Sequence, residues 1–182
     1  MKNKIGFYLF LTFFFLNFGT LHSQTVQILP PPINIPGLSV KSPYISYDGT
    51  KLVFILENRD SSVLAESSKN SNGTWSKPHS VDAINKFTEK PFYIESPTYN
   101  QDVTELYFSL IFNAKDSTSD IYKSIKIGGN WQKPIKLPKP INSEEYESDP
   151  CISPDGKTLY FVRYFDNPSI NDFQCTRIYF SH

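Results

Sequence analysis

Two carboxylates, an arginine and a tyrosine are the side chains best placed to do chemistry in this sequence. Glu95 and Glu147 each stand immediately before a predicted short strand, and Arg163 and Tyr164 follow the strand after Glu147. Carboxylates in such a pair can bind a cationic group or carry out acid–base catalysis. The alternative, which we favour, is that they only cap strands and stay hydrated. These four residues are the candidate ligand-binding residues, and no catalytic residue is predicted.

Other patterns of catalytic or metal-binding residues are missing from the sequence. The three histidines are His22, His79 and His182, and none is placed to join a Ser-His-Asp set on an inner loop. Cys151 and Cys175 have no histidines at the spacing of a zinc site, and no glycine-rich phosphate loop is present. We therefore expect no metal, no cofactor and no enzymatic activity.

The candidate residues flank a segment that occurs three times. The copies are "PYISYDGTKLVF" from Pro43, "PTYNQDVTELYF" from Pro97 and "PCISPDGKTLYF" from Pro150. The prolines are 54 and then 53 residues apart, and an aspartate, a leucine and a phenylalanine follow each of them at the same spacing. "WSKP" from Trp75 and "WQKP" from Trp131 follow their prolines by 32 and 34 positions. A fixed period of this size signals a repeat architecture.

Each copy predicts four strands. The first is short and runs through Ile45, Tyr99 or Ile152. The second ("KLVFIL", "ELYFSL", "TLYFVR") is apolar on both faces, as expected of a sheet packed between two others. The third is "SVLAE", "DIYKS" or "RIYFS", and the fourth begins at the tryptophan and runs to "AIN" or "PIN". Such antiparallel sheets, repeated along one chain, are the blades of a β-propeller.

The expected fold class is therefore all-β, a partial β-propeller of about three four-stranded antiparallel blades. The blades are expected at about 39–92, 93–146 and 147–182. The first strand of a blade is innermost and borders the central channel. We therefore expect Glu95 and Glu147 at the mouth of the channel, with Arg163 and Tyr164 at the opposite end of the same hairpin.

The turn between the first and second strands depends on an aspartate and a glycine. The aspartate can bond the backbone, and glycine accepts a positive φ. One carboxylate per turn indicates a turn device, not a calcium loop. The second copy has Val103 where the others have Gly49 and Gly156. Its turn must therefore differ or be strained.

The segments "PYISYDGTKLVF" and "DPCISPDGKTLYF", with "GNWQKP", resemble the WD40-like, TolB-type β-propeller repeat of exported bacterial proteins. The resemblance covers Ser39 to His182. It implies the blade fold and no common active site, because proteins that share a fold need not share a function. Tyr47 and Gln101 replace the motif proline and Val103 replaces the motif glycine, which makes the middle blade the least regular.

Residues 1–23 match a secretory signal peptide. Lys2 and Lys4 precede an apolar run from Ile5 to Phe18, and Ser23 is a small residue at the expected cleavage site. The run is shorter than the ~20 residues that a membrane span needs, although a short membrane anchor is the alternative. We expect a mature chain that begins near Gln24, has no membrane span and is periplasmic or secreted.

Charge and cysteine content limit the partners of the mature chain. Without Lys2 and Lys4, 16 basic residues stand against 18 acidic ones, a formal charge of −2. This balance gives no electrostatic footprint for nucleic acid. An oxidising compartment would permit a disulfide between Cys151 and Cys175. The two are expected on strands that are not neighbours, so two free thiols are the other interpretation.

The start of the mature chain looks like a fourth strand without its blade. "QILPPPIN" (residues 27–34) matches "IKLPKPIN" (residues 135–142), which belongs to a fourth strand, whereas the third copy has no fourth strand in this sequence. Residues 24–38 are therefore expected to be a closure strand that completes the last blade, or else a linker. The open alternatives are a fragment of a longer propeller, an open arc, or two copies that self-associate into a six-blade ring.

The leading functional expectation is an exported, non-enzymatic binding or scaffold protein. Its ligand would be a protein, a peptide or a cell-envelope glycan. The alternative is a propeller fragment of a glycan or peptide hydrolase that uses Glu95 and Glu147. A fragment of a longer envelope protein, with its catalytic or anchoring domain elsewhere, is a further alternative.

Overall fold

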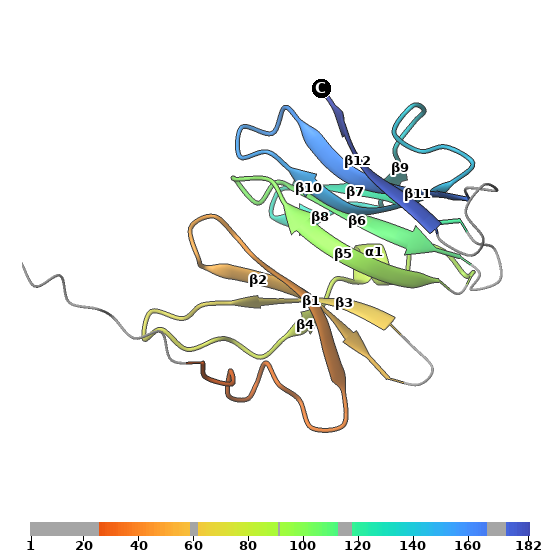
Figure 1. Ribbon diagram of the computed structural model, residues 1–182. Helices are drawn as coiled ribbons and strands as arrows, with labels where there is room; N and C mark the ends of the chain where they lie inside the picture. Colours follow the sequence, from red (N-terminus) through yellow and green to blue (C-terminus); the bar gives the residue numbers. More distant parts are fainter. Residues whose placement is uncertain (1–25, 59–61, 91, 113–117, 167–173) are drawn as a thin grey trace, which may run out of the picture.

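The computed structural model describes residues 26–58, 62–90, 92–112, 118–166 and 174–182 of the chain. The predicted signal peptide lies outside these residues. The described strands form three antiparallel sheets, and in each the long strands pair in the order in which they occur along the chain. Figure 1 shows the second sheet between the first and the third.

The element bounds follow the repeat. The first sheet consists of β1 (Ser39–Ile45), β2 (Lys51–Glu57), β3 (Ser62–Ser68) and β4 (His79–Ser80), followed by helix α1 (Asp82–Asn85). The second consists of β5 (Tyr93–Tyr99), β6 (Glu105–Ile111), β7 (Asp120–Ile127), β8 (Asn130–Trp131) and β9 (Ile135–Lys136). The third consists of β10 (Tyr146–Ile152), β11 (Leu159–Asp166) and β12 (Gln174–Ser181).

The predicted fold class, an all-β partial propeller of about three antiparallel blades, is confirmed. The fourth strand, however, is shorter than predicted. β4, β8 and β9 have two residues each, and "AIN" of the first copy lies in the single turn of α1. Pro78 and Pro134 lie beside these short strands and, like every proline, have no N–H to donate to a ladder. The prediction of a long fourth strand is therefore wrong.

Alternation along the second strand places core residues in both gaps between sheets. Phe108 of β6 is fully buried and packs with Val53 and Ile55 of the first sheet. The preceding residue, Tyr107, points to the other face and packs with Phe161 of the third sheet. Because successive side chains of a strand point to opposite faces, one strand stabilises both interfaces.

Phe54 differs from its repeat equivalents. It is fully buried, but it packs with Leu52, Ala65 and Ile33 on the outer face of the first sheet. The aligned sequence predicts that all three repeat phenylalanines lie between neighbouring sheets, and this prediction is wrong for Phe54. Ile33, from the segment before β1, covers it in place of a neighbouring sheet.

In the turns after β1, β5 and β10, a side-chain oxygen accepts a backbone N–H in the same way, although the side chain differs between turns. The hydroxyl of Ser46 accepts the N–H of Lys51 at 2.8 Å, and Asn100 Oδ1 accepts the N–H of Glu105 at 2.9 Å. In the first turn Asp48 also accepts the Ser46 hydroxyl at 2.6 Å and the Thr50 N–H at 3.0 Å. The Ser46 hydrogen bond, with those from Thr50, lowers the pKa of Asp48 to about 2. The interpretation of the aspartate as a turn device is correct for Asp48.

Val103 is strained, as its sequence position predicts. Its φ is +54°, in the left-handed region where Gly49 and Gly156 both have +71°. A β-branched residue is a genuine outlier there, because its Cβ crowds the backbone. The backbone of the middle turn is therefore under conformational strain, which the other two turns avoid because they have glycine at this position.

Replacing Gly49 by alanine is expected to lower the free energy of unfolding by about 1–2 kcal/mol, the cost of a left-handed L-residue. A Cβ at Gly49 would meet no atom within 4 Å, so the effect is conformational and not steric. Urea-induced unfolding measures it. Gly49→Asn is the matched control and should lose less, because asparagine tolerates this region. Equal losses for the two variants would contradict this explanation.

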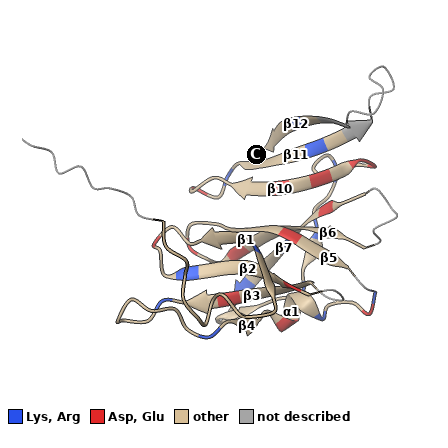
Figure 2. Cartoon of the chain, turned by 60° about the horizontal axis from the view of Figure 1, so that its bottom comes forward, with Lys and Arg blue, Asp and Glu red and all other residues tan. Residues whose placement is uncertain are grey.

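Charges are scattered over the three sheets, with acidic and basic residues interspersed (Figure 2). Cys151 is exposed and free, and its strand β10 is separated from the strand of Cys175 by β11. The prediction that the two cysteines lie on strands that are not neighbours is confirmed. Among the described residues, no helix has the length and apolar character needed to cross a membrane.

Candidate functional site

The innermost strand of each sheet is interrupted at the same place. Ser42 of β1, Ser96 of β5 and Asp149 of β10 have φ values of +47°, +49° and +51°, and each precedes the repeat proline. The pairing with the second strand shifts register at all three positions. Such bulges re-aim side chains, and strained backbone in equivalent places is a reason to look for function there.

A hydrogen bond joins two of these bulges across neighbouring sheets. The Ser96 hydroxyl donates to Asp149 Oδ1 at 2.6 Å, and the Ser148 hydroxyl donates to Oδ2 at 2.9 Å. Asp149 is exposed, and an ionised carboxylate has about four acceptor sites. The Asp149 carboxylate is thus held in place by two donors and keeps capacity for N–H groups from outside.

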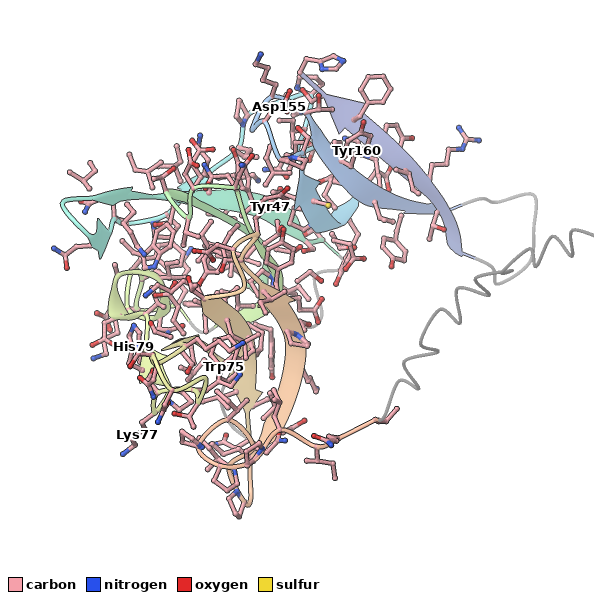
Figure 3. All side chains as sticks on the ribbon, turned by 90° about the vertical axis from the view of Figure 1, so that its left-hand side faces the viewer. Tyr47, Trp75, Lys77, His79, Asp155 and Tyr160 are labelled. Carbon is pink, nitrogen blue, oxygen red and sulfur yellow. The ribbon has the colours of Figure 1, made fainter. Side chains whose placement is uncertain are left out.

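The three bulges line a groove that we call the inner-strand groove. Its central hollow, of about 290 Å³, is lined by Ser42–Tyr44, Ser96–Thr98 and Asp149–Cys151. A second hollow of about 400 Å³ adjoins it at the turn end of the inner strands, and Tyr47 and Pro154 line that hollow. Figure 3 shows Tyr47 on the side of the first sheet that faces Asp155 and Tyr160 of the third. All three sheets thus contribute to one open surface.

Glu147 and Arg163 are brought together, but in the interior. The two residues face each other across the β10–β11 pair, so the expectation that they occupy opposite ends of the hairpin is wrong. Antiparallel pairing places the start of one strand beside the end of the next. Arg163 Nε donates to Glu147 Oε1 at 2.7 Å, and Ser143 gives the same carboxylate its hydroxyl and its N–H. The Glu147 side chain is fully buried, so its carboxylate cannot touch a ligand in the groove, and neither residue of the pair lines the groove.

Arg163 has further partners besides Glu147. Its Nη2 donates to the carbonyls of Pro140 and Ile141 at 2.9 Å each, and its guanidinium lies 4.7 Å from the centre of the Tyr179 ring. Arg163 therefore joins the second sheet's last segment to the third sheet. This role is structural.

Glu95 is the one predicted site residue that is both acidic and exposed at the groove. Its carboxylate accepts the hydroxyl of Tyr146 at 3.3 Å and lines a hollow of about 290 Å³ with Ser42 and Ser96. Burial, followed by the nearby Glu95 charge, raises the pKa of Tyr146 to about 12, so the phenol stays protonated and donates. Tyr164 packs edge-on against Tyr146, with ring centres 5.2 Å apart. Tyr164 thus packs against the ring of Tyr146.

Glu66 is a second buried carboxylate that sequence reasoning missed. It accepts the hydroxyl of Tyr99 from the neighbouring sheet and lies 3.5 Å from Nε2 of His79. Burial, and then the Glu66 charge, raises the pKa of Tyr99 well above its usual range. His79 lies on the outer part of the first sheet with Trp75 and Lys77 (Figure 3), away from the groove hollows. The Glu66–Tyr99 hydrogen bond therefore connects the first sheet to the second.

The site residues that the sequence did not single out are Ser42, Ser96 and Asp149. Their signal was present, since each directly precedes an aligned proline. Their left-handed backbone was not predictable, because a residue before proline is normally extended. Within the part of the chain that the structure describes, no cluster of three or more metal-ligating side chains is found.

No protein-family model matches this chain, and no curated protein does either. Solved structures resemble it at low identity. They include a prolyl endopeptidase (19% identity, TM-score 0.47, covering 78% of this chain and 22% of that one). TolB from Acinetobacter baumannii has 16% identity and a TM-score of 0.45, over 79% of this chain and 30% of that one. An endo-arabinase from Bacteroides thetaiotaomicron has 16% identity and a TM-score of 0.46, over 78% and 54%.

The chain thus spans between about a fifth and about half of the length of these proteins. At such identities the similarity concerns fold alone, and the activities of these proteins do not transfer to this chain.

Proposed function

We propose that this chain is an exported, non-enzymatic β-propeller protein of the WD40-like, TolB type that binds an extended peptide segment of a partner protein in the inner-strand groove. The observation that carries the proposal is the Asp149 carboxylate, exposed in a groove to which all three sheets contribute. Two hydroxyl groups fix its orientation before any ligand arrives. A preorganised acceptor loses little entropy on binding.

The lining of the groove favours a peptide over a small polar ligand. Pro43, Pro97 and Pro150 give it rigid apolar walls, and Tyr44 adds an aromatic face. Asp149 in the groove, and Glu95 in the hollow that it lines next to the groove with Ser42 and Ser96, add two exposed carboxylates on neighbouring inner strands. Apolar contact, combined with a few fixed acceptors, suits a segment that carries a basic side chain or an amino terminus.

The burial of Glu147 argues against the hydrolase alternative based on Glu95 and Glu147. An acid–base residue must come within hydrogen-bond reach of the substrate. Glu147 is fully buried and bonded to Arg163 and Ser143, whereas Glu95 is exposed. The two carboxylates therefore cannot flank one bond of a bound substrate in this conformation.

Asp149→Asn is expected to weaken peptide binding about tenfold. Hydrogen bonds to a charged group contribute about 1.5–3 kcal/mol, and 1.4 kcal/mol corresponds to a factor of ten. A displayed library of random peptides, selected on the wild-type protein, provides the probe, and fluorescence anisotropy measures its Kd. Glu145→Gln removes an exposed carboxylate outside the groove lining and is the matched control.

Two results would overturn the proposed function. One is that the selected peptides bind wild type and Asp149→Asn equally. The other is that wild-type protein hydrolyses a panel of glycans or peptides and that Glu95→Gln or Glu147→Gln abolishes the hydrolysis.

Export is a separate part of the proposal. Mass spectrometry of the periplasmic or secreted fraction is expected to find a chain that begins near Gln24, because residues 1–23 have the three parts of a secretory signal. A chain with an intact Met1 in the cytoplasmic fraction would contradict export.

A further inference from the structure

An asparagine clamps the third strand of the first two sheets. In the first sheet, Asn85 accepts the N–H of Leu64 at 2.9 Å and donates to its carbonyl at 2.8 Å. In the second, Asn142 accepts the N–H of Ile121 at 2.7 Å and donates to its carbonyl at 2.9 Å. The clamp accepts the N–H of one residue of the strand edge and gives its carbonyl a second donor besides the backbone N–H of Val81 or Leu137.

The third sheet has the same edge without the clamp. Ile178 of β12 is the repeat equivalent of Leu64 and Ile121, since each stands one place before the residue that pairs with the repeat phenylalanine. Leu64 and Ile121 are 0% exposed, whereas Ile178 is 78% exposed. Among the described residues, only β11 pairs with β12. By analogy with the first two sheets, this edge could accept an asparagine clamp on the backbone of Ile178 and an apolar side chain that covers it.

The segment before β1 already has the conformation of a clamp. Asn34 Nδ2 donates to the carbonyl of Leu29 at 2.6 Å, and Asn142 Nδ2 donates to the carbonyl of Leu137 at 2.7 Å, and in both cases the partners are five positions apart in the sequence. Ile33 packs on the outer face of the first sheet, as Ile141 packs at the boundary between the second and third sheets. Residues 27–34 thus pack on the first sheet in the way that 135–142 pack on the third, and no strand of the described part of the chain pairs with this segment.

The exposed apolar residues at the two ends of the stack of sheets are repeat equivalents of residues in a buried cluster. Between the second and third sheets, Tyr107, Ile121 and Leu137 are at most 9% exposed and surround Phe161. Their repeat equivalents are Tyr160, Ile178 and Leu29, which are 45%, 78% and 42% exposed.

These three equivalents do not meet within one chain. Tyr160 and Ile178 belong to the third sheet, whereas Leu29 lies in the segment before β1, on the first sheet at the far end of the stack (Figure 1). Together with Phe54, they would rebuild the cluster that surrounds Phe161.

We propose that residues 27–34 of one copy of this chain add to the β12 edge of a second copy, with Asn34 clamping the backbone of the partner's Ile178. The contact is reciprocal, so two copies related by a two-fold axis bury both edges. The six sheets then form a ring within the usual range of propellers, and such closure removes exposed sheet edges. The interface goes beyond the peptide-binding function and does not depend on it.

Register follows from the second sheet. There Lys136 of β9 pairs with Tyr122 of β7, and Leu137 donates its N–H to the carbonyl of Ile121 at 3.0 Å. The equivalent pair joins Ile28 of one copy to the partner's Tyr179. A disulfide between these two positions is therefore a direct probe.

The test uses the full mature chain with Cys151 and Cys175 replaced by serine. One preparation carries Ile28→Cys, and a second, with a different affinity tag, carries Tyr179→Cys. After mild oxidation, the mixture is expected to give a linked dimer that contains both tags and a peptide joining positions 28 and 179. Ile28 is 86% exposed, so its replacement leaves the core intact.

Sedimentation of the untagged chain gives an independent readout. Wild type is expected to be a dimer, and Asn34→Ala is expected to raise its Kd about a hundredfold, roughly tenfold for each of two clamps. Asn72→Ala, in an exposed loop, is the matched control and should leave the Kd unchanged.

Three results would overturn the inference. The first is a wild-type chain that stays monomeric in sedimentation at high micromolar concentration. The second is a variant carrying both cysteines that links only within one chain. The third is an Asn34→Ala variant whose Kd equals that of wild type.

Discussion

Replacing Phe108 by alanine is expected to lower the free energy of unfolding by about 3–5 kcal/mol, the range for removing a large buried aromatic side chain. Phe108 is fully buried between the first and second sheets, and its ring stacks on Tyr122 at 6.4 Å. Neighbouring sheets hold the backbone on both sides, so the cavity cannot collapse fully. Urea-induced unfolding, followed by tryptophan fluorescence, measures the loss.

The control for this variant must leave packing untouched. Lys133→Ala removes an exposed side chain outside the hydrophobic clusters and should change stability by less than about 0.5 kcal/mol. Lys123 of β7 would be a poor control, because its Nζ donates to Glu105 Oε1 at 2.9 Å. A Phe108→Ala variant that unfolds like Lys133→Ala would show that the sheets are not packed as described.

Replacing Arg163 by methionine is also expected to cost about 3–5 kcal/mol, because it leaves the buried Glu147 carboxylate without its counter-charge. Methionine keeps the apolar stem that packs near Tyr179, so the loss reports the charge and its hydrogen bonds. The same unfolding measurement applies. Arg163→Lys should recover only part of the loss, because an ammonium cannot reproduce the fork that reaches Glu147 and two carbonyls.

A double variant distinguishes an ion pair from simple packing. If Glu147 is the cause, Arg163→Met combined with Glu147→Gln should be more stable than Arg163→Met alone, since no charge then stays buried. Additive losses in the double variant would mean that the two side chains act independently and that the proposed cause is wrong.

The architecture was predictable because it follows from the period of the sequence repeat and from the pattern of apolar residues along the strands. The spacing of Pro43, Pro97 and Pro150 placed each first strand, and apolar runs on both faces predicted sheets packed on each other. The strained turn at Val103 followed from the same alignment, because glycine stands at that position in the other two copies.

The candidate site was less predictable, because side-chain partners depend on neighbours that are distant in sequence. Glu95 stands two residues before its repeat proline and Glu147 three residues before, so the two side chains point to opposite faces of their strands, and Glu95 is exposed whereas Glu147 is buried. The counter-charge of the buried Glu147 comes from position 163, where only the third copy has an arginine, the other two having leucine. The bulge at Asp149 depends on a backbone conformation that residue type alone did not indicate.

The order of strand pairing in Figure 1 also bears on how the molecule comes apart. Among the described residues, the long strands of each sheet form a meander of strands adjacent in sequence, and each sheet packs mainly on the sheet before or after it. The stability of such an array is approximately a sum of unit terms and nearest-neighbour terms. In a single copy outside the proposed ring, damage at one end therefore stays at that end, and the array frays unit by unit, with the middle sheet the last to exchange its amide protons with solvent.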